Sequence, residues 1–206
     1  MQRLAMFPLG TVLLPHMVLP LQVFEPRYQR LLEDVLAGDG RFGVVLISRG
    51  QEVGGGEVRT DLGTIAQVLR AEPLDDGRWL VISLGTSRFR VTRWLNDDPY
   101  PQAEIDVLTD EHREGEVAAR RVQLEPLIRR VLALRQQLGE DGVPPDFELS
   151  SDPDVACWQT AVMAPLNAFD AQRLLSSDRC TDRLALLEEL LIGLEETLRF
   201  RLNGEP

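Results

Sequence analysis

The spacing of apolar residues changes near residue 109, and this change constrains the fold of the chain more than any other feature. Before it, short runs rich in Val, Ile and Leu alternate with turn residues, which is typical of β-strands. After it, apolar residues recur with a period near 3.6, which is typical of helices that bury one face. We therefore expect an α+β protein, with a largely antiparallel β domain over residues 1–109 and a helical bundle domain over residues 110–206.

The first part is expected to hold several strands and one inserted helix. The four clearest strand runs are residues 41–48, 63–72, 78–84 and 89–95. Residues 73–77 predict a hairpin loop in which Gly77 has a positive φ, and Gly54 to Gly56 predict a mobile loop. Pro26 suits the first turn of a helix, and the residues after it keep helical spacing up to Gly38.

The second part is expected to hold four helices. The apolar face of the first ends at Gly139 and consists of Val117, Leu124, Leu127, Val131, Leu134 and Leu138. Asp152 and Pro153 start the second helix, and Pro165 stops it. A short helix follows over residues 168–175, and the last runs from about residue 179 to 202. Its apolar seam is expected to be buried in a bundle and not in a coiled coil, because it covers fewer than three heptads; it consists of Leu184, Leu187, Leu191, Leu194 and Leu198.

The composition excludes several chemistries. All 22 basic residues are arginine, so the chain has no lysine for a Walker A loop or for the base of a Ser-Lys peptidase. The only two histidines, His16 and His112, are far apart, and neither they nor the two cysteines have the spacing of metal ligands. We expect no structural zinc and no cofactor, and we expect Cys157 and Cys180 to be buried thiols.

The charge and the apolar pattern bear on partners and location. The net charge is −11, and the helical part is the more acidic, with 11 Arg against 19 Asp and Glu; the first part has 11 against 14. An acidic chain is a poor candidate for binding nucleic acid. The longest apolar stretch, residues 7–24, contains three prolines, so we expect no membrane helix, no signal peptide and a cytoplasmic location.

Short motifs follow one another in a characteristic order along nearly the whole chain. They are Phe7-Pro8-Leu9-Gly10, Val12-Leu13-Leu14-Pro15, Leu19-Pro20-Leu21, Phe24-Glu25-Pro26-Arg27-Tyr28, Gly40-Arg41-Phe42-Gly43-Val44, Leu62-Gly63-Thr64, Asp76-Gly77-Arg78, Gly85-Thr86-Ser87-Arg88-Phe89-Arg90, Asp170-Ala171-Gln172-Arg173-Leu174-Leu175 and Arg183-Leu184-Ala185-Leu186-Leu187. In this order the chain resembles the N-terminal substrate-recognition domain of the bacterial Lon protease family. The resemblance implies a PUA-like β pseudo-barrel followed by a helical bundle, and the same β module occurs in cereblon.

The resemblance also implies a function. A Lon N-terminal domain recognises unfolded or tagged polypeptides, so we expect a non-catalytic, stand-alone binding module without the ATPase and protease domains. It would work alone or deliver clients to a separate protease or chaperone. Two alternatives remain: an RNA-binding PUA-like protein, which the charge opposes, and a divergent hydrolase. The hydrolase would use Ser87 with His16 or His112, but no serine lies in a G-x-S-x-G motif.

The candidate peptide-binding residues are Leu14, His16, Met17 and Tyr28. The stretch around the first three carries more apolar surface than one half-buried strand can hide, and methionine adapts to varied clients. A sheet edge nearby could also accept an extended client by strand addition. The alternative is that these residues fill the core of the β domain.

A structural role is expected for the segment from Glu25 to Tyr28. Pro26 fixes φ at the helix start, and Glu25 benefits from the helix dipole and could pair with an arginine such as Arg88. Arg27 belongs to the same motif. We expect Gly63 and Gly85 to permit a bulge or a close approach of the backbone.

Overall fold

The computed structural model describes residues 2–52, 56–109, 114–144 and 146–204. The chain divides into two compact units, residues 1–109 and residues 110–206. The first unit contains β1 (Gln2–Leu9), β2 (Val18–Val23), α1 (Pro26–Ala37), β3 (Arg41–Arg49), β4 (Val58–Pro73), β5 (Trp79–Trp94) and β6 (Gln102–Val107). The second contains α2 (Glu114–Gln137), α3 (Pro153–Met163), α4 (Ala168–Leu175) and α5 (Cys180–Leu202). Gly54, Gly55 and His112 lie outside the described residues.

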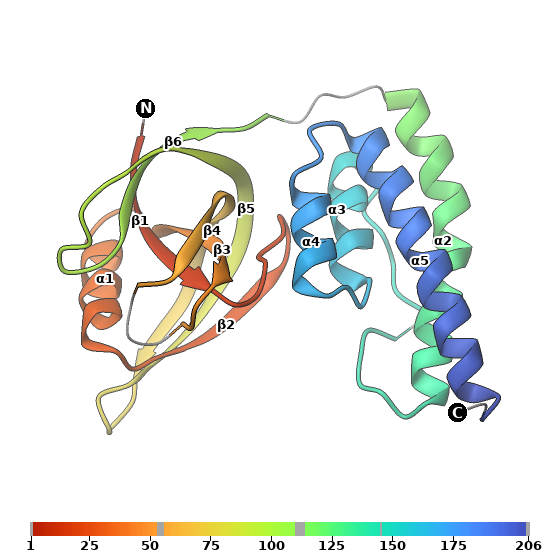
Figure 1. Cartoon of the computed structure of the whole chain (residues 1–206), viewed down its shortest axis with the longest axis horizontal. Coiled ribbons are helices and arrows are strands. Elements are labelled where there is room, and N and C mark those ends of the chain that lie inside the picture. Colours follow the sequence, from red (N-terminus) through yellow and green to blue (C-terminus); the bar gives the residue numbers. More distant parts are fainter. Residues whose placement is uncertain (1, 53–55, 110–113, 145, 205–206) are drawn as a thin grey trace. The chain divides into compact units, whose positions relative to one another are not determined.

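The described strands form one six-stranded mixed sheet in the order β2-β5-β4-β3-β1-β6 (Figure 1). β1 and β3 are parallel, and the other neighbours are antiparallel. The second half of β5 also pairs with β6, so the sheet closes on itself through β5. Since β2 pairs only with the first half of β5, it is the edge strand of the described sheet.

β5 is longer than the sequence pattern predicts, because the runs 78–84 and 89–95 join into one strand through Gly85. A Cβ at Gly85 would lie 2.2 Å from the carbonyl oxygen of Leu14, and a Cβ at Gly63 would lie 2.2 Å from that of Val44. No side chain fits such spaces, which confirms the expected close approach of the backbone at both glycines.

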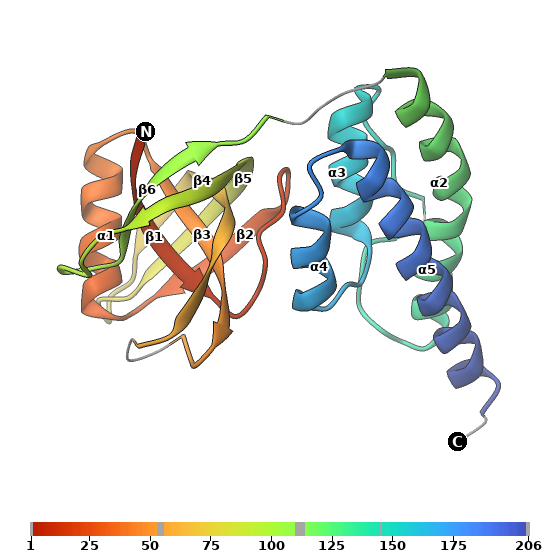
Figure 2. The ribbon, with the colours of Figure 1, turned by 45° about the horizontal axis from the view of Figure 1, so that its top comes forward.

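α1 covers one face of the sheet in the first unit (Figure 2). It starts at Pro26 and buries Tyr28, Leu31, Leu32 and Val35. The Tyr28 ring stacks on Phe7 of β1, with 4.2 Å between the ring centroids. The helix thus anchors the main apolar core of the unit, which also contains Phe42, Val44 and Val81. The hairpin loop at residues 73–77 is confirmed, with Gly77 at φ 83°.

The second unit is helical, and its longest helices, α2 and α5, run side by side (Figures 1 and 2). Asp152 caps α3, because its side chain accepts hydrogen bonds from two backbone amides of the first turn. Most of the expected seam of α5 is buried, namely Leu184, Leu187, Leu191 and Leu198. Cys157 and Cys180 are buried as well. No helix in the described ranges has the length and apolar character needed to cross a membrane.

Candidate functional site

The candidate site is a groove on the outer face of β2, β5 and β4. The register places Pro20 opposite Ile82 and Gln22 opposite Leu80. On the other side of β5, Ile82 lies opposite Arg70, and Leu80 lies opposite Glu72. Residues opposite one another on neighbouring strands share a face of the sheet. Three strands therefore contribute two cross-strand rows to one surface.

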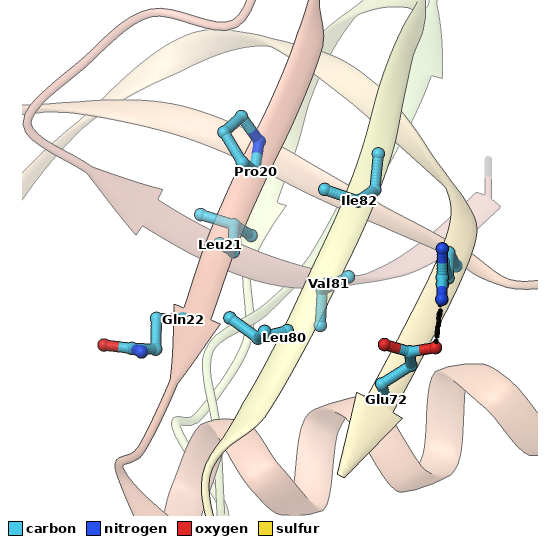
Figure 3. A pocket seen from close by; sticks show the side chains of 8 residues that line it. Pro20, Leu21, Gln22, Glu72, Leu80, Val81 and Ile82 are labelled. Carbon is cyan, nitrogen blue, oxygen red and sulfur yellow. Dashed lines mark hydrogen bonds and ion pairs between the residues drawn. The ribbon is translucent and has the colours of Figure 1, made fainter. Parts of the chain in front are cut away.

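The centre of this groove is apolar and open to solvent. The groove encloses about 430 Å³ and is lined by Pro20, Leu21, Gln22, Arg70, Glu72, Leu80, Val81 and Ile82. The Leu80 side chain is 43% exposed, Pro20 is exposed and Ile82 is half-buried. Figure 3 shows the labelled lining residues on three adjacent strands: Pro20, Leu21 and Gln22 on β2, Leu80, Val81 and Ile82 on β5, and Glu72 on β4. An apolar patch at which several strands meet is the kind of surface that binds a partner.

Polar side chains border the groove. The Arg70 guanidinium pairs with the Glu72 carboxylate at 2.5 Å, and both side chains are largely exposed. An exposed ion pair of this kind contributes little to stability. Because the charges of Arg70 and Glu72 neutralise each other, this pair adds no net charge beside the apolar centre.

A second, smaller hollow runs along β2 towards β1 and α1. It encloses about 190 Å³, and it shares Pro20, Leu21 and Gln22 with the groove. Its other lining residues are Phe7, Leu9, Val23, Phe24, Glu25, Tyr28 and Glu52. Burial raises the pKa of Tyr28 to about 12. The Tyr28 hydroxyl makes no hydrogen bond within the described chain.

The four candidate peptide-binding residues do not form one exposed surface. Leu14 and Tyr28 are each 3% exposed, so both side chains lie in the core of the first unit. The backbone turns here, with the Met17 amide bonded to the Leu14 carbonyl, and the turn directs the Leu14 side chain inward. His16 lies in this turn at φ 64° and is exposed, while Met17 is half-buried against the core.

The segment from Glu25 to Tyr28 stabilises the start of α1. Pro26 occupies the first turn, as expected. Glu25 pairs with Arg27 at 3.2 Å and not with Arg88, which is buried in β5. The Arg27 guanidinium also lies over the Tyr28 ring, 4.5 Å from its centroid. The Glu25 carboxylate therefore has its partner within the helix start itself.

The sequence interpretation missed the groove residues Leu80 and Ile82. A signal for them was present: residues 79–84 are apolar at nearly every position, although a strand with one buried face needs only alternate apolar residues. The excess apolar side chains of this run are the ones on the outer face. The described residues contain no group of three or more His, Cys, Asp or Glu side chains placed to bind a metal ion.

Comparisons with known proteins agree with this architecture. The family model of the ATP-dependent protease La (LON) substrate-binding domain matches residues 3–193. The Lon protease of Cytophaga hutchinsonii is 27% identical over 186 residues, which cover 87% of this chain and 22% of that protein. Lon protease 2 of Myxococcus xanthus is 30% identical over 142 residues, which cover 66% of this chain and 17% of that protein. The chain thus spans about a fifth of the length of these relatives.

Solved structures show the same fold. The Lon N-terminal domain protein from Xanthomonas campestris is 28% identical, with a TM-score of 0.63 over 93% of this chain and 98% of that one. The N-terminal domain of the Mycobacterium avium complex Lon protease is 18% identical, with a TM-score of 0.67 over 95% and 98%. With a family match over nearly the whole sequence, this chain belongs to the Lon substrate-binding domain family.

Proposed function

We propose that this chain is a non-catalytic recognition module that holds apolar segments of unfolded or tagged polypeptides in the groove of β2, β5 and β4. The observation that carries the proposal is the apolar centre of the groove, formed by the exposed Pro20 and Leu80 with the half-buried Ile82. The family match supports it, because it covers a substrate-binding domain and not an ATPase or a protease domain.

The form of the groove suits varied clients. Its apolar centre gains free energy by leaving water, and this gain depends on area and not on a particular sequence. The paired Arg70 and Glu72 at the rim place no unpaired charge against an apolar segment. A module with these properties favours exposed core residues of unfolded proteins over the polar surfaces of folded ones.

The proposal extends to the setting of the chain. We infer a PUA-like pseudo-barrel for residues 1–109, which the closure of the sheet through β5 and β6 supports. Residues 110–206 form the proposed helical bundle domain. Clients would pass to a separate protease or chaperone in the bacterial cytoplasm, and the mostly bacterial Lon proteases among the relatives support this setting.

Leu80→Asp tests the proposed function. Leu80 is exposed, so the change should leave the fold intact while placing a charge in the centre of the groove. We expect at least about tenfold weaker binding of a labelled, permanently unfolded protein such as carboxymethylated α-lactalbumin, measured by fluorescence anisotropy.

Val58→Asp is the matched control. Val58 is an exposed apolar residue of the same unit, at the start of β4, and does not line the groove. Thermal unfolding of both variants checks that they fold. Equal affinity of wild type, Leu80→Asp and Val58→Asp would place the client elsewhere and reject the groove.

A further inference from the structure

Resting on this proposed function, we propose that the client binds as an additional β-strand along the outer edge of β2. The inference goes beyond an apolar groove, because it assigns the client's backbone to hydrogen bonds with β2. It is carried by the orientation of the backbone groups of β2, by the position of Pro20 and by the two hollows that share this strand.

The register shows which backbone groups of β2 face outward. The Gly85 amide donates to the Met17 carbonyl at 2.9 Å, so this pair is of the hydrogen-bonded type. In an antiparallel ladder, hydrogen-bonded and non-hydrogen-bonded pairs alternate. Leu19, Leu21 and Val23 therefore direct their backbone groups to β5. The residues between them, Val18, Pro20 and Gln22, direct theirs away from β5.

Pro20 agrees with this assignment. A proline has no amide hydrogen, so inside a sheet it is tolerated where that hydrogen would point away from the neighbouring strand. The outer edge of β2 then offers the amide and carbonyl groups of Val18 and Gln22 and the carbonyl of Pro20. In the described sheet β2 pairs with β5 alone. Such a row of donors and acceptors matches the backbone of an extended polypeptide.

The two hollows can receive the side chains of this client, one alternating set in each. Pro20, Leu21 and Gln22 line both hollows; the groove continues onto β5 and β4, and the other hollow continues onto β1 and α1. Side chains of a strand alternate between the two faces of a sheet. A strand added to β2 would direct one set of side chains to the groove side and the other towards Phe7 and Phe24. The client class is thus an extended segment of about six residues, the length of β2, with apolar side chains.

Backbone methylation of a peptide tests the strand. The probe is a labelled eight-residue peptide of alternating Val and Thr, compared with two derivatives that are N-methylated either at the Val or at the Thr residues. In an added strand, one alternate set of amides faces β2 and the other faces solvent. We expect one derivative to bind about tenfold or more weakly and the other within about twofold of the parent.

Gln22→Pro tests the same contact from the protein. It removes one outward amide hydrogen and retains all hydrogen bonds between β2 and β5, as Pro20 does. Gln22→Ala is the matched control, since it removes the same side chain and keeps the amide. We expect Gln22→Pro to bind the parent peptide about three- to tenfold more weakly than Gln22→Ala. Should Gln22→Pro fail to fold in a thermal melt, the methylated peptides still decide.

The outcomes separate this inference from the proposed function. If the parent peptide binds in a Leu80-dependent manner and both methylated derivatives bind equally well, the groove is correct and strand addition is wrong. If neither the peptide nor the unfolded protein binds, the proposed function fails first. A concentration-dependent dimer that Gln22→Pro abolishes and the peptide does not disrupt would assign the edge to a second copy of the chain, and overturn the inference.

Discussion

At the scale of single residues, Tyr28 carries a hydroxyl that the fold buries without a hydrogen bond in the described chain. The Tyr28 ring makes two favourable contacts, since it stacks on Phe7 and lies under the guanidinium of Arg27. A buried polar group without a partner destabilises the folded state. The ring therefore explains the residue in structural terms, and the hydroxyl marks the place where the core meets the second hollow.

Tyr28→Phe should change the alkaline stability of the protein. Burial raises the pKa of Tyr28 to about 12, whereas an unfolded tyrosine titrates near 10. The stability that this shift provides is thus complete below pH 10 and falls by up to about 1.4 kcal/mol for each pH unit between 10 and 12. The variant should lack this loss and be at least as stable as wild type at pH 7.5. Urea unfolding at pH 7.5 and 11 gives the free energy of unfolding of wild type and variant at each pH. If both proteins lost the same free energy of unfolding between these pH values, the expectation would be contradicted.

At the scale of elements, the helical seam and the edge strand follow different rules. The seam of α5 was predictable, because apolar residues that recur with a period near 3.6 lie on one face of a helix, and that face is the one that the fold buries. The groove was not, because the outer face of a sheet is normally polar, and an apolar run alone does not show which residues face outward. The register that pairs Pro20 with Ile82 arises from the three-dimensional pairing of β2 with β5.

The variants Leu191→Ala and Ile192→Ala compare a buried position of the seam with its exposed neighbour. Leu191 is fully buried and Ile192 is 47% exposed on the same helix. Removing the Leu191 side chain leaves a cavity and should cost about 2–5 kcal/mol, while Ile192→Ala should cost less than about 1 kcal/mol. Equilibrium unfolding in urea gives both values. Similar small losses for the two variants would mean that the seam is not part of the core.

Pro20→Val tests how the edge strand limits its own pairing. A proline on an edge strand interrupts the row of donors and so discourages association with other strands. Valine keeps an apolar side chain in the groove and restores one outward amide. We expect about two- to tenfold tighter binding of the Val and Thr peptide, together with more self-association in analytical ultracentrifugation. An unchanged or lower peptide affinity would show that this amide takes no part in binding.

At the scale of the whole molecule, the groove and the charge lie in different parts of the chain. The groove lies in residues 1–109, which carry 11 Arg against 14 acidic residues, and the greater negative charge lies in residues 110–206. Apolar contacts are insensitive to salt, whereas the attraction of a basic client to surface carboxylates is screened at physiological ionic strength. The two units therefore differ in what each can contribute to recognition.

The fragment of residues 1–109 should fold and bind without the helical unit. The main core of this fragment lies within it, as does a second buried apolar cluster that consists of Leu4, Met6, Val45, Ile65, Phe89, Val91, Ala103 and Ile105. Every lining residue of the groove lies in it as well. We expect one cooperative thermal transition and an affinity for the unfolded client within about threefold of that of the whole chain, nearly unchanged between 50 and 500 mM salt. Thermal melts by circular dichroism and anisotropy titrations measure these quantities. A folded fragment that binds tenfold more weakly would assign part of the client site to residues 110–206, whereas loss of cooperative unfolding would show that the first unit depends on the second for its stability.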